Sequence, residues 1–328
     1  MVEESERLMA LLSGQRVDRP PLWEPWFAMQ EMMKQQYGND YLQMAEVLHM
    51  AAVPIRGVDT SVHFMAPTER IDQTGVWYGG GALRQLKQLT DRPEPDWTTQ
   101  VEQLIPERQR CADAGRACWV VLPWCFHAVA TSMGLEHFAT QCYDRPDFVH
   151  EAMQWVERRN QIAIKQVIAR VRPDFVLLDG DCAYKTGTMI APDMMCRFCF
   201  DPSRRTVEMI SDLNIPMTFH TDGKLDDVIP LLLDLGIRAV HGCERQANDL
   251  SHLVETFGDD IVLCGNMDVT FLKQASVDQV RQRTLKMLHV GAAKRRFIAG
   301  CNTSPQDYIP DVNYQTMCRT IAEFKSDT

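Results

Sequence analysis

The sequence predicts one α/β domain, a (β/α)8 TIM barrel that spans residues 1–328 and begins with an irregular segment. From about residue 115 onward, short apolar runs alternate with longer amphipathic segments, as in parallel βα units. The chain has 328 residues, of which 45% are hydrophobic, enough for one large core. No repeat, low-complexity tract or linker divides the chain.

The first hundred residues have weaker patterns. We interpret residues 20–24 as a first strand and residues 56–62 as a second. Between residues 69 and 97, three consecutive glycines and a Pro-Glu-Pro segment interrupt any hydrophobic period. Loops or a hairpin are therefore expected there.

The later part of the chain contains six further expected strands with helices between them. The strands are residues 117–122, 174–179, 216–220, 237–241, 261–264 and 296–300. The helices are residues 136–169, 192–213, 226–235 and 277–290. Ser276 is placed to cap the last of these helices, and Gly236 and Gly291 are placed to end two of them.

Composition and charge exclude several classes of partner. The chain has 44 acidic and 34 basic side chains and a net charge of -10, so its surface repels nucleic acid and anionic lipid. Its acidic start lacks a secretory signal, and no apolar run approaches the ~20 residues of a membrane helix. The eleven cysteines lack disulfide-scaffold spacing and fit a reducing compartment. A cytoplasmic protein is expected, with neither nucleic acid nor membrane as partner.

Ionisable or ligating side chains follow five consecutive strands. They are Asp179 and Asp181; His220 and Asp222; His241, Cys243 and Glu244; Cys264, Asn266 and Asp268; and Cys301 and Asn302. In a parallel barrel the carboxyl ends of the strands share one face, which is where barrel enzymes hold their active sites. The sequence therefore predicts a site at this mouth.

His220, Asp222 and Glu244 are the candidate catalytic residues. His220 and Asp222 are two positions apart, so in a strand they point the same way, and Gly223 permits a sharp turn after them. They could bind a metal, or form an acid/base pair in which the carboxylate fixes the tautomer of the imidazole. The alternative is a core histidine followed by a helix-capping aspartate.

A zinc site is expected from His220, Asp222 and Cys301, with Glu244 as a further ligand or general base. Imidazole, carboxylate and thiolate are all ligands that zinc accepts. The alternative for Cys301 is a buried and inert thiol, as is expected of most of the other ten cysteines.

Five further residues are candidates for substrate binding. Asp179 and Asp181 could orient a substrate or form a salt bridge on a loop, and Asn266 follows a later strand. Trp23 and Trp26 could wall a pocket for a flat or apolar ligand, although clustered tryptophans are more often part of a core.

Several segments together resemble the uroporphyrinogen decarboxylase superfamily. They are residues 16–23, 178–183, 190–192, 215–223, 263–268, and Cys301 through 313–317. The resemblance covers nearly the whole chain and implies a barrel with its site at the strand mouths. It also implies one of two activities, because the superfamily contains tetrapyrrole decarboxylases and zinc-dependent methyltransferases that act with corrinoid proteins. The decarboxylases suggest a homodimer.

The residues favour the methyltransferase branch. Where the decarboxylases carry Arg-Gln-Ala-Gly-Arg, residues 23–27 read Trp-Glu-Pro-Trp-Phe, which offers no clamp for a substrate with many carboxylates. The methyltransferases use His-x-Cys and a distant Cys as zinc ligands. This chain keeps His220 and offers Cys301, but has Asp222 in place of the first Cys. A carboxylate leaves a harder and more Lewis-acidic zinc, which suits polarising an ether oxygen.

The resemblance therefore implies transfer of a methyl group from a methoxylated small substrate, for example an aromatic one, to the cobalt of a corrinoid. The chain has no Asp-x-His-x-x-Gly segment, so the corrinoid is expected on a separate protein. One alternative is the opposite half-reaction, from a methylated corrinoid to a thiol. Others are decarboxylase-like chemistry and a non-catalytic barrel that binds a tetrapyrrole or corrinoid.

Overall fold

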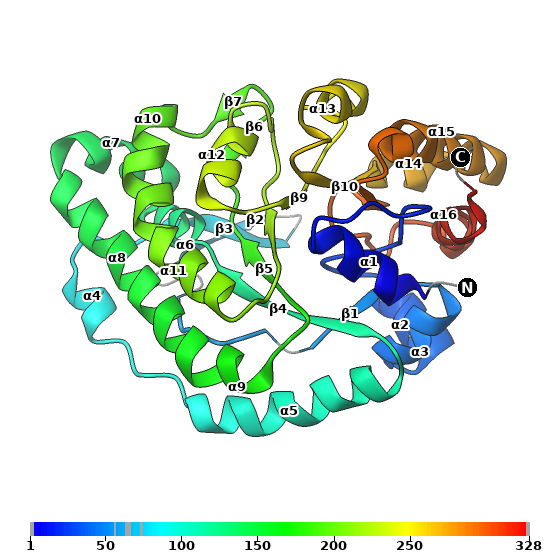
Figure 1. Cartoon of the computed structure of the whole chain (residues 1–328). Coiled ribbons are helices and arrows are strands. Elements are labelled where there is room, and N and C mark those ends of the chain that lie inside the picture. The colour runs from blue at the N-terminus through cyan, green and yellow to red at the C-terminus, as the bar shows by residue number, and fades with distance from the viewer. Residues whose placement is uncertain (1–2, 56, 63–66, 73–74, 326–328) are drawn as a thin grey trace.

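The computed structural model describes residues 3–55, 57–62, 67–72 and 75–325. Its main feature is a curled sheet of seven parallel strands in the order β1-β4-β5-β8-β9-β10-β11 (Figure 1). The strands are β1 (Ala52–Pro54), β4 (Ala117–Pro123), β5 (Phe175–Asp179), β8 (Met217–His220), β9 (Ala239–His241), β10 (Val262–Met267) and β11 (Phe297–Cys301). Six of these strands confirm the six predicted after residue 115.

A single residue, Leu22, lies between the two edges of this sheet. It forms parallel bridges with Met50, just before β1, and with Ala299 of β11. The Ala51 N–H also donates to the Leu22 carbonyl at 2.7 Å. The strand expected at residues 20–24 is thus present only as a bridge, and the sheet agrees with a TIM-like barrel in which a full eighth strand is not formed.

The second expected strand was wrong. The strand at this place in the sheet is β1, which ends before residue 56. Residues 57–62 form no strand, and residue 56 lies outside the described residues. The Asp59 side chain accepts the Ser61 N–H at 2.7 Å, a local turn that competes with sheet pairing. The hairpin expected as one option after residue 69 is present as antiparallel β2 (Pro67–Asp72) and β3 (Gly75–Gly81).

Helices surround the sheet; most cover its outer face, and the first of them packs against the inner layer. They are α1 (Glu4–Leu12), α2 (Gln30–Tyr37), α3 (Tyr41–Val47), α4 (Lys87–Thr90), α5 (Trp97–Asp113), α6 (Cys125–Met133), α7 (Leu135–Asp144), α8 (Pro146–Ala163), α9 (Ala169–Val171), α10 (Pro192–Met195), α11 (Asp201–Asp212), α12 (Val228–Leu235), α13 (Leu250–Phe257), α14 (Val269–Gln274), α15 (Val277–Gly291) and α16 (Asp311–Glu323). A small hairpin, β6 (Ala183–Tyr184) and β7 (Gly187–Thr188), follows β5. In the described part of the chain, no helix combines the length and apolarity that crossing a bilayer requires.

Helix boundaries follow the predicted chemistry with two exceptions. Gly291 does not end its helix in the left-handed region as expected, because it is the last residue of α15 and has a helical φ of -63°. Ser276 caps α15 by a capping box with Gln279, and Gly236 ends α12 in the left-handed region with φ 93°. The helix expected over residues 136–169 is instead divided at Arg145, because Pro146 starts α8 and cannot continue the hydrogen bonding of α7.

Successive strand residues alternate between an inner and an outer apolar layer. Trp119 of β4 and Phe175 of β5 pack inside the curled sheet with Leu8 and Leu11 of α1. Their neighbours along the strands, such as Val120, belong to the layer beneath the helices. Figure 1 shows α5, α8 and α11 outside β4 and β5, with α15 and α16 on the other side of the molecule. This alternation decides which side chains at the strand ends face the mouth.

Candidate metal centre

Three neighbouring strands each end in a polar side chain on the inner face. In the sheet register Asp179 of β5 pairs with His220 of β8, and His220 pairs with His241 of β9. Phe175, Leu177 and Ala239 of the same strands pack in the inner layer, so residues two positions further on also point inward. The register therefore brings these three side chains to one level at the mouth.

The ligand atoms of Asp181, His220 and Asp222 converge within 4.8 Å of one another. The Nε2 atom of His220 lies 3.6 Å from Oδ1 of Asp181 and 3.9 Å from Oδ1 of Asp222. The Asp222 backbone N–H donates to Oδ1 of Asp181 at 2.9 Å, which ties the ends of β5 and β8 together. We call these residues the Asp-His-Asp group.

A hydrogen-bonded relay fixes the tautomer of His220. Nε2 of His241 lies 3.1 Å from the carbonyl oxygen of Cys301, which can only accept, so Nε2 carries the proton. Burial lowers the pKa of His241 well below its usual value, so the ring is neutral and its Nδ1 is an acceptor. Nδ1 of His220, 2.8 Å away, must then donate to it. The lone pair of His220 is left on Nε2, which faces the two carboxylates.

When both aspartates are ionised, this arrangement leaves three acceptors facing one another. Burial lowers the pKa of His220 to about 3, so Nε2 is unprotonated at neutral pH. Burial, and then the charges of Asp181 and Glu244, raise the pKa of Asp222 to about 7. Oδ1 of Asp222 is buried, and no hydrogen-bond partner for it exists among the described residues. A cation at this point would satisfy all three atoms, and one imidazole with two carboxylates suits zinc or a similar divalent ion.

The expected ligands Cys301 and Glu244 lie outside this group. Cys301 shares the outer face of β11 with Phe297 and Ala299, so its side chain points toward the helices rather than into the mouth. Burial, followed by the charge of Glu24, raises the pKa of its thiol well above the usual value. Glu244 is close enough for its charge to raise the pKa of Asp222, but its oxygens do not join the three ligand atoms.

The residues expected to bind substrate are placed in different surroundings. Asp179 is at the mouth, where burial and the charge of Asp181 raise its pKa to about 7. Asp181 belongs to the Asp-His-Asp group. Asn266 donates to the Cys243 carbonyl at 2.6 Å and faces a separate cavity that Arg245 also lines.

The two tryptophans have separate roles in the packing. Trp23 is 1% exposed and packs edge-on against Trp119 and Phe175, with ring centroids 5.8 and 5.3 Å away, so it belongs to the inner layer. Trp26 stands edge-on to His220 at 4.4 Å between ring centroids. It also lines a cavity of about 520 Å³ together with Glu24 and Trp119, which we call the mouth cavity.

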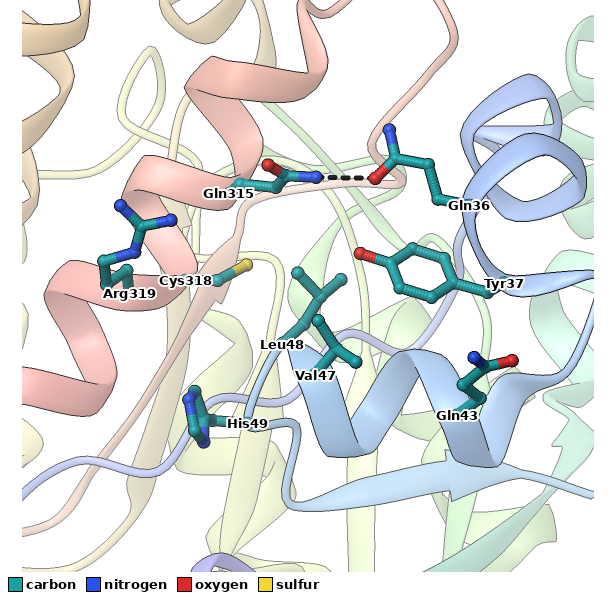
Figure 2. Close-up of a pocket in the computed structure, with 9 residues that line it drawn as sticks. All are labelled: Gln36, Tyr37, Gln43, Val47, Leu48, His49, Gln315, Cys318 and Arg319. Carbon is teal, nitrogen blue, oxygen red and sulfur yellow. Dashed lines mark hydrogen bonds between the residues drawn. The ribbon is translucent and has the colours of Figure 1, made fainter.

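A second cavity, of about 340 Å³, lies away from these residues between α2, α3 and α16. Figure 2 shows Gln36 and Gln315 joined across it by a hydrogen bond of 2.7 Å, with Tyr37 and Cys318 beneath them. Its described lining has no carboxylate, and it lacks Trp26, the residue that joins the mouth cavity to His220. We therefore place the candidate site at the mouth.

Two residues of the site were missed from the sequence. Nδ1 of His127, on α6, accepts the Asp181 N–H at 3.1 Å and so positions the loop that carries this carboxylate. Glu24 lines the mouth cavity. Both residues follow a strand or a bridge by a few positions. Polar side chains just after a strand were the signal for the other site residues, and the same signal marks these two.

The His241 relay predicts a measurable effect on metal affinity. His241→Phe keeps a ring in the same packing but removes both hydrogen bonds, so His220 is no longer held in its tautomer. A loss of roughly 10–100-fold in zinc affinity is expected, typical of residues that orient a ligand. Competition with a chromogenic chelator measures the zinc affinity. The control is His289→Phe, at an exposed position on α15. Equal zinc affinities in the two variants would refute the relay.

The family is shown by direct comparison. Residues 120–324, which include the whole Asp-His-Asp group, match the family described as uroporphyrinogen decarboxylase (URO-D). The chain belongs to this family. Membership confirms the superfamily that the sequence resembles, and no curated protein sequence matches at a significant level.

Solved structures of similar fold extend this result. A methyltransferase from Methanosarcina mazei superposes with a TM-score of 0.75 at 15% identity, covering 99% of both chains. The 3-keto-D-glucoside 4-epimerase from E. coli gives 0.44 at 9% identity, covering 70% of this chain and 88% of its own. At 15% identity the likeness to the methyltransferase establishes a shared fold alone, and it extends over 99% of this URO-D family chain.

Proposed function

We propose that this URO-D family protein is a methyltransferase that moves a methyl group from a methoxylated small substrate to the cobalt of a corrinoid on a separate protein. A zinc ion held by Asp181, His220 and Asp222 would assist. The observation that carries the proposal is the unprotonated Nε2 of His220 facing two carboxylates at 3.6 and 3.9 Å. The fold shared with the methyltransferase from Methanosarcina mazei supports it.

The chain's own residues prepare this site for an ion. Cys301, through its carbonyl oxygen, and His241 hold His220 in the tautomer that presents Nε2. His127 and the Asp222 N–H hold Asp181 in place. When bound, the zinc would act as a Lewis acid on the ether oxygen of the substrate.

The chemistry of the ligand atoms favours demethylation over methylation of a thiol. The Asp-His-Asp group offers one nitrogen and two oxygens and no sulfur. Oxygen ligands leave more positive charge on the metal than thiolates do, which suits an oxygen leaving group. This supports the direction that the sequence resemblance implied.

The mouth cavity provides a place for the substrate. Its volume of about 520 Å³ lies within the roughly 300–1,000 Å³ of small-molecule sites, and its walls include Trp26, Phe27 and Trp119. Trp26 contacts both the cavity and His220, so a ring held in the cavity would lie beside the Asp-His-Asp group. Holding the two reactants in line supplies much of the rate enhancement in such transfers.

The test uses zinc-loaded protein, 2-methoxyphenol and free cob(I)alamin as a stand-in for the partner protein. Formation of catechol and methylcobalamin in equal amounts is expected, and neither should form with His220→Ala. Methylation of a thiol by methylcobalamin, without loss of methyl from any methoxyarene, would reverse the proposed direction. Absence of both reactions with zinc bound would refute a methyltransferase.

A further inference from the structure

The carboxylate of Glu24 is buried where the chain closes the sheet. It is 5% exposed, and both of its oxygens accept the Cys301 N–H, at 3.0 and 3.1 Å. Oε1 also accepts the hydroxyl of Tyr314 on α16 at 3.3 Å. A Cβ atom at residue 300 would lie 2.4 Å from the Trp23 carbonyl oxygen, so only glycine there lets this segment lie against β11.

Among the described residues that line the mouth cavity, Glu24 carries the one carboxylate. The described residues that line the cavity include no Lys, Arg or His, and most of the lining is aromatic or aliphatic, with hydroxyls from Tyr41 and Ser304. Burial raises the pKa of Glu24 to about 8. The cavity thus combines apolar walls with one strong acceptor.

The protein contacts of Glu24 do not require a carboxylate. Both of its partners, the Cys301 N–H and the Tyr314 O–H, donate. A glutamine would accept these two hydrogen bonds through its amide oxygen without burying an acid. What distinguishes the acid from the amide is therefore its effect on whatever enters the cavity.

We propose that Glu24 is the specificity-determining residue of the mouth cavity, which accepts a methyl donor with an O–H or N–H group and rejects donors with a carboxylate. This rests on the proposed function, because it assigns the substrate to the mouth cavity. In either protonation state Glu24 keeps a carbonyl-type oxygen that accepts a hydrogen bond. An ionised Glu24 repels a ligand carboxylate, and a protonated one leaves that carboxylate buried with no cation among the described lining residues.

Three ligands that share a methoxyphenyl ring and differ in one further substituent separate these effects: methoxybenzene, 2-methoxyphenol and 3-methoxybenzoate. The measurement is made at about pH 9, above the pKa of Glu24, so that this carboxylate is ionised. We expect 2-methoxyphenol to bind roughly tenfold tighter than methoxybenzene there, as for a hydrogen bond to a charged acceptor. 3-Methoxybenzoate should bind at least about tenfold more weakly than methoxybenzene. Isothermal titration calorimetry of the zinc-loaded protein measures all three without cobalt or turnover.

Glu24→Gln tests whether this residue sets the ranking. The variant keeps the acceptor for Cys301 and Tyr314, and we expect it to reduce both the hydroxyl preference and the carboxylate penalty by roughly tenfold. Glu46→Gln, which removes the same charge from an exposed position on α3, should leave the ranking unchanged.

Two results would overturn the inference. They are equal binding of 3-methoxybenzoate and methoxybenzene by the unmodified protein, and an unchanged ranking in folded Glu24→Gln. Binding is measured without methyl transfer, so the two claims can fail separately. If the protein ranks the ligands as expected but does not demethylate them, the proposed function is overturned and the inference stands. The first of these results needs only the unmodified protein, so the inference can be refuted even if the Glu24→Gln variant does not fold.

Discussion

His220→Ala is expected to remove the bound metal and to lower the rate of methyl transfer by about a thousandfold or more. His220 supplies the one uncharged ligand atom of the Asp-His-Asp group. Without it, two carboxylates face each other with no third ligand to complete the metal site. Lewis-acid assistance is worth several kcal/mol, and each 1.4 kcal/mol is about tenfold in rate. Elemental analysis and single-turnover demethylation of the same preparation measure the two effects.

The control for this variant is His289→Ala, which removes an exposed histidine from α15. It should retain the metal and the rate of the unmodified protein. A His220→Ala protein that holds its metal and works at the normal rate would show that the Asp-His-Asp group is not the site.

Trp23→Ala is expected to lower the free energy of unfolding by about 3–5 kcal/mol, the range for a fully buried tryptophan. Its indole packs edge-on against Trp119 and Phe175, and its segment bridges the two edges of the sheet beside Leu22. Its Nε1 has no hydrogen-bond partner among the described residues, so the loss comes from packing alone. Urea titration followed by circular dichroism measures the change.

Trp97→Ala provides the comparison, because this tryptophan begins α5 at the partly exposed edge of the outer layer. A smaller loss is expected there. If Trp23→Ala cost less than Trp97→Ala, the segment around Leu22 would not help to close the barrel.

The strands of the second half could be predicted because each is a short apolar run between amphipathic helices. The first strands could not. β1 has only three residues, and the first is reduced to a bridge at Leu22, so neither gives a periodic signal. The division at Arg145 was also missed, although Pro146 marks it, because the apolar pattern continues across the break.

The sequence correctly grouped His220 with Asp222 but could not decide which way Cys301 points. Strands of a parallel sheet are buried on both faces, so their hydrophobic pattern does not separate inward from outward residues. Counting by two from Phe297 places Cys301 outside, but only once Phe297 is known to face the helices. Asp181 was expected to orient a substrate or to form a salt bridge on a loop. Its position beside His220 depends on the loop geometry after β5, which the sequence pattern does not reveal.

Metal content of two variants tests the central claim most directly. Asp181→Asn removes a carboxylate of the Asp-His-Asp group, whereas Cys301→Ser alters a thiol on the outer face of β11. After loading with zinc and desalting, the first should have lost the ion and the second should keep about one equivalent. Zinc that stays in Asp181→Asn and leaves Cys301→Ser would contradict the assignment.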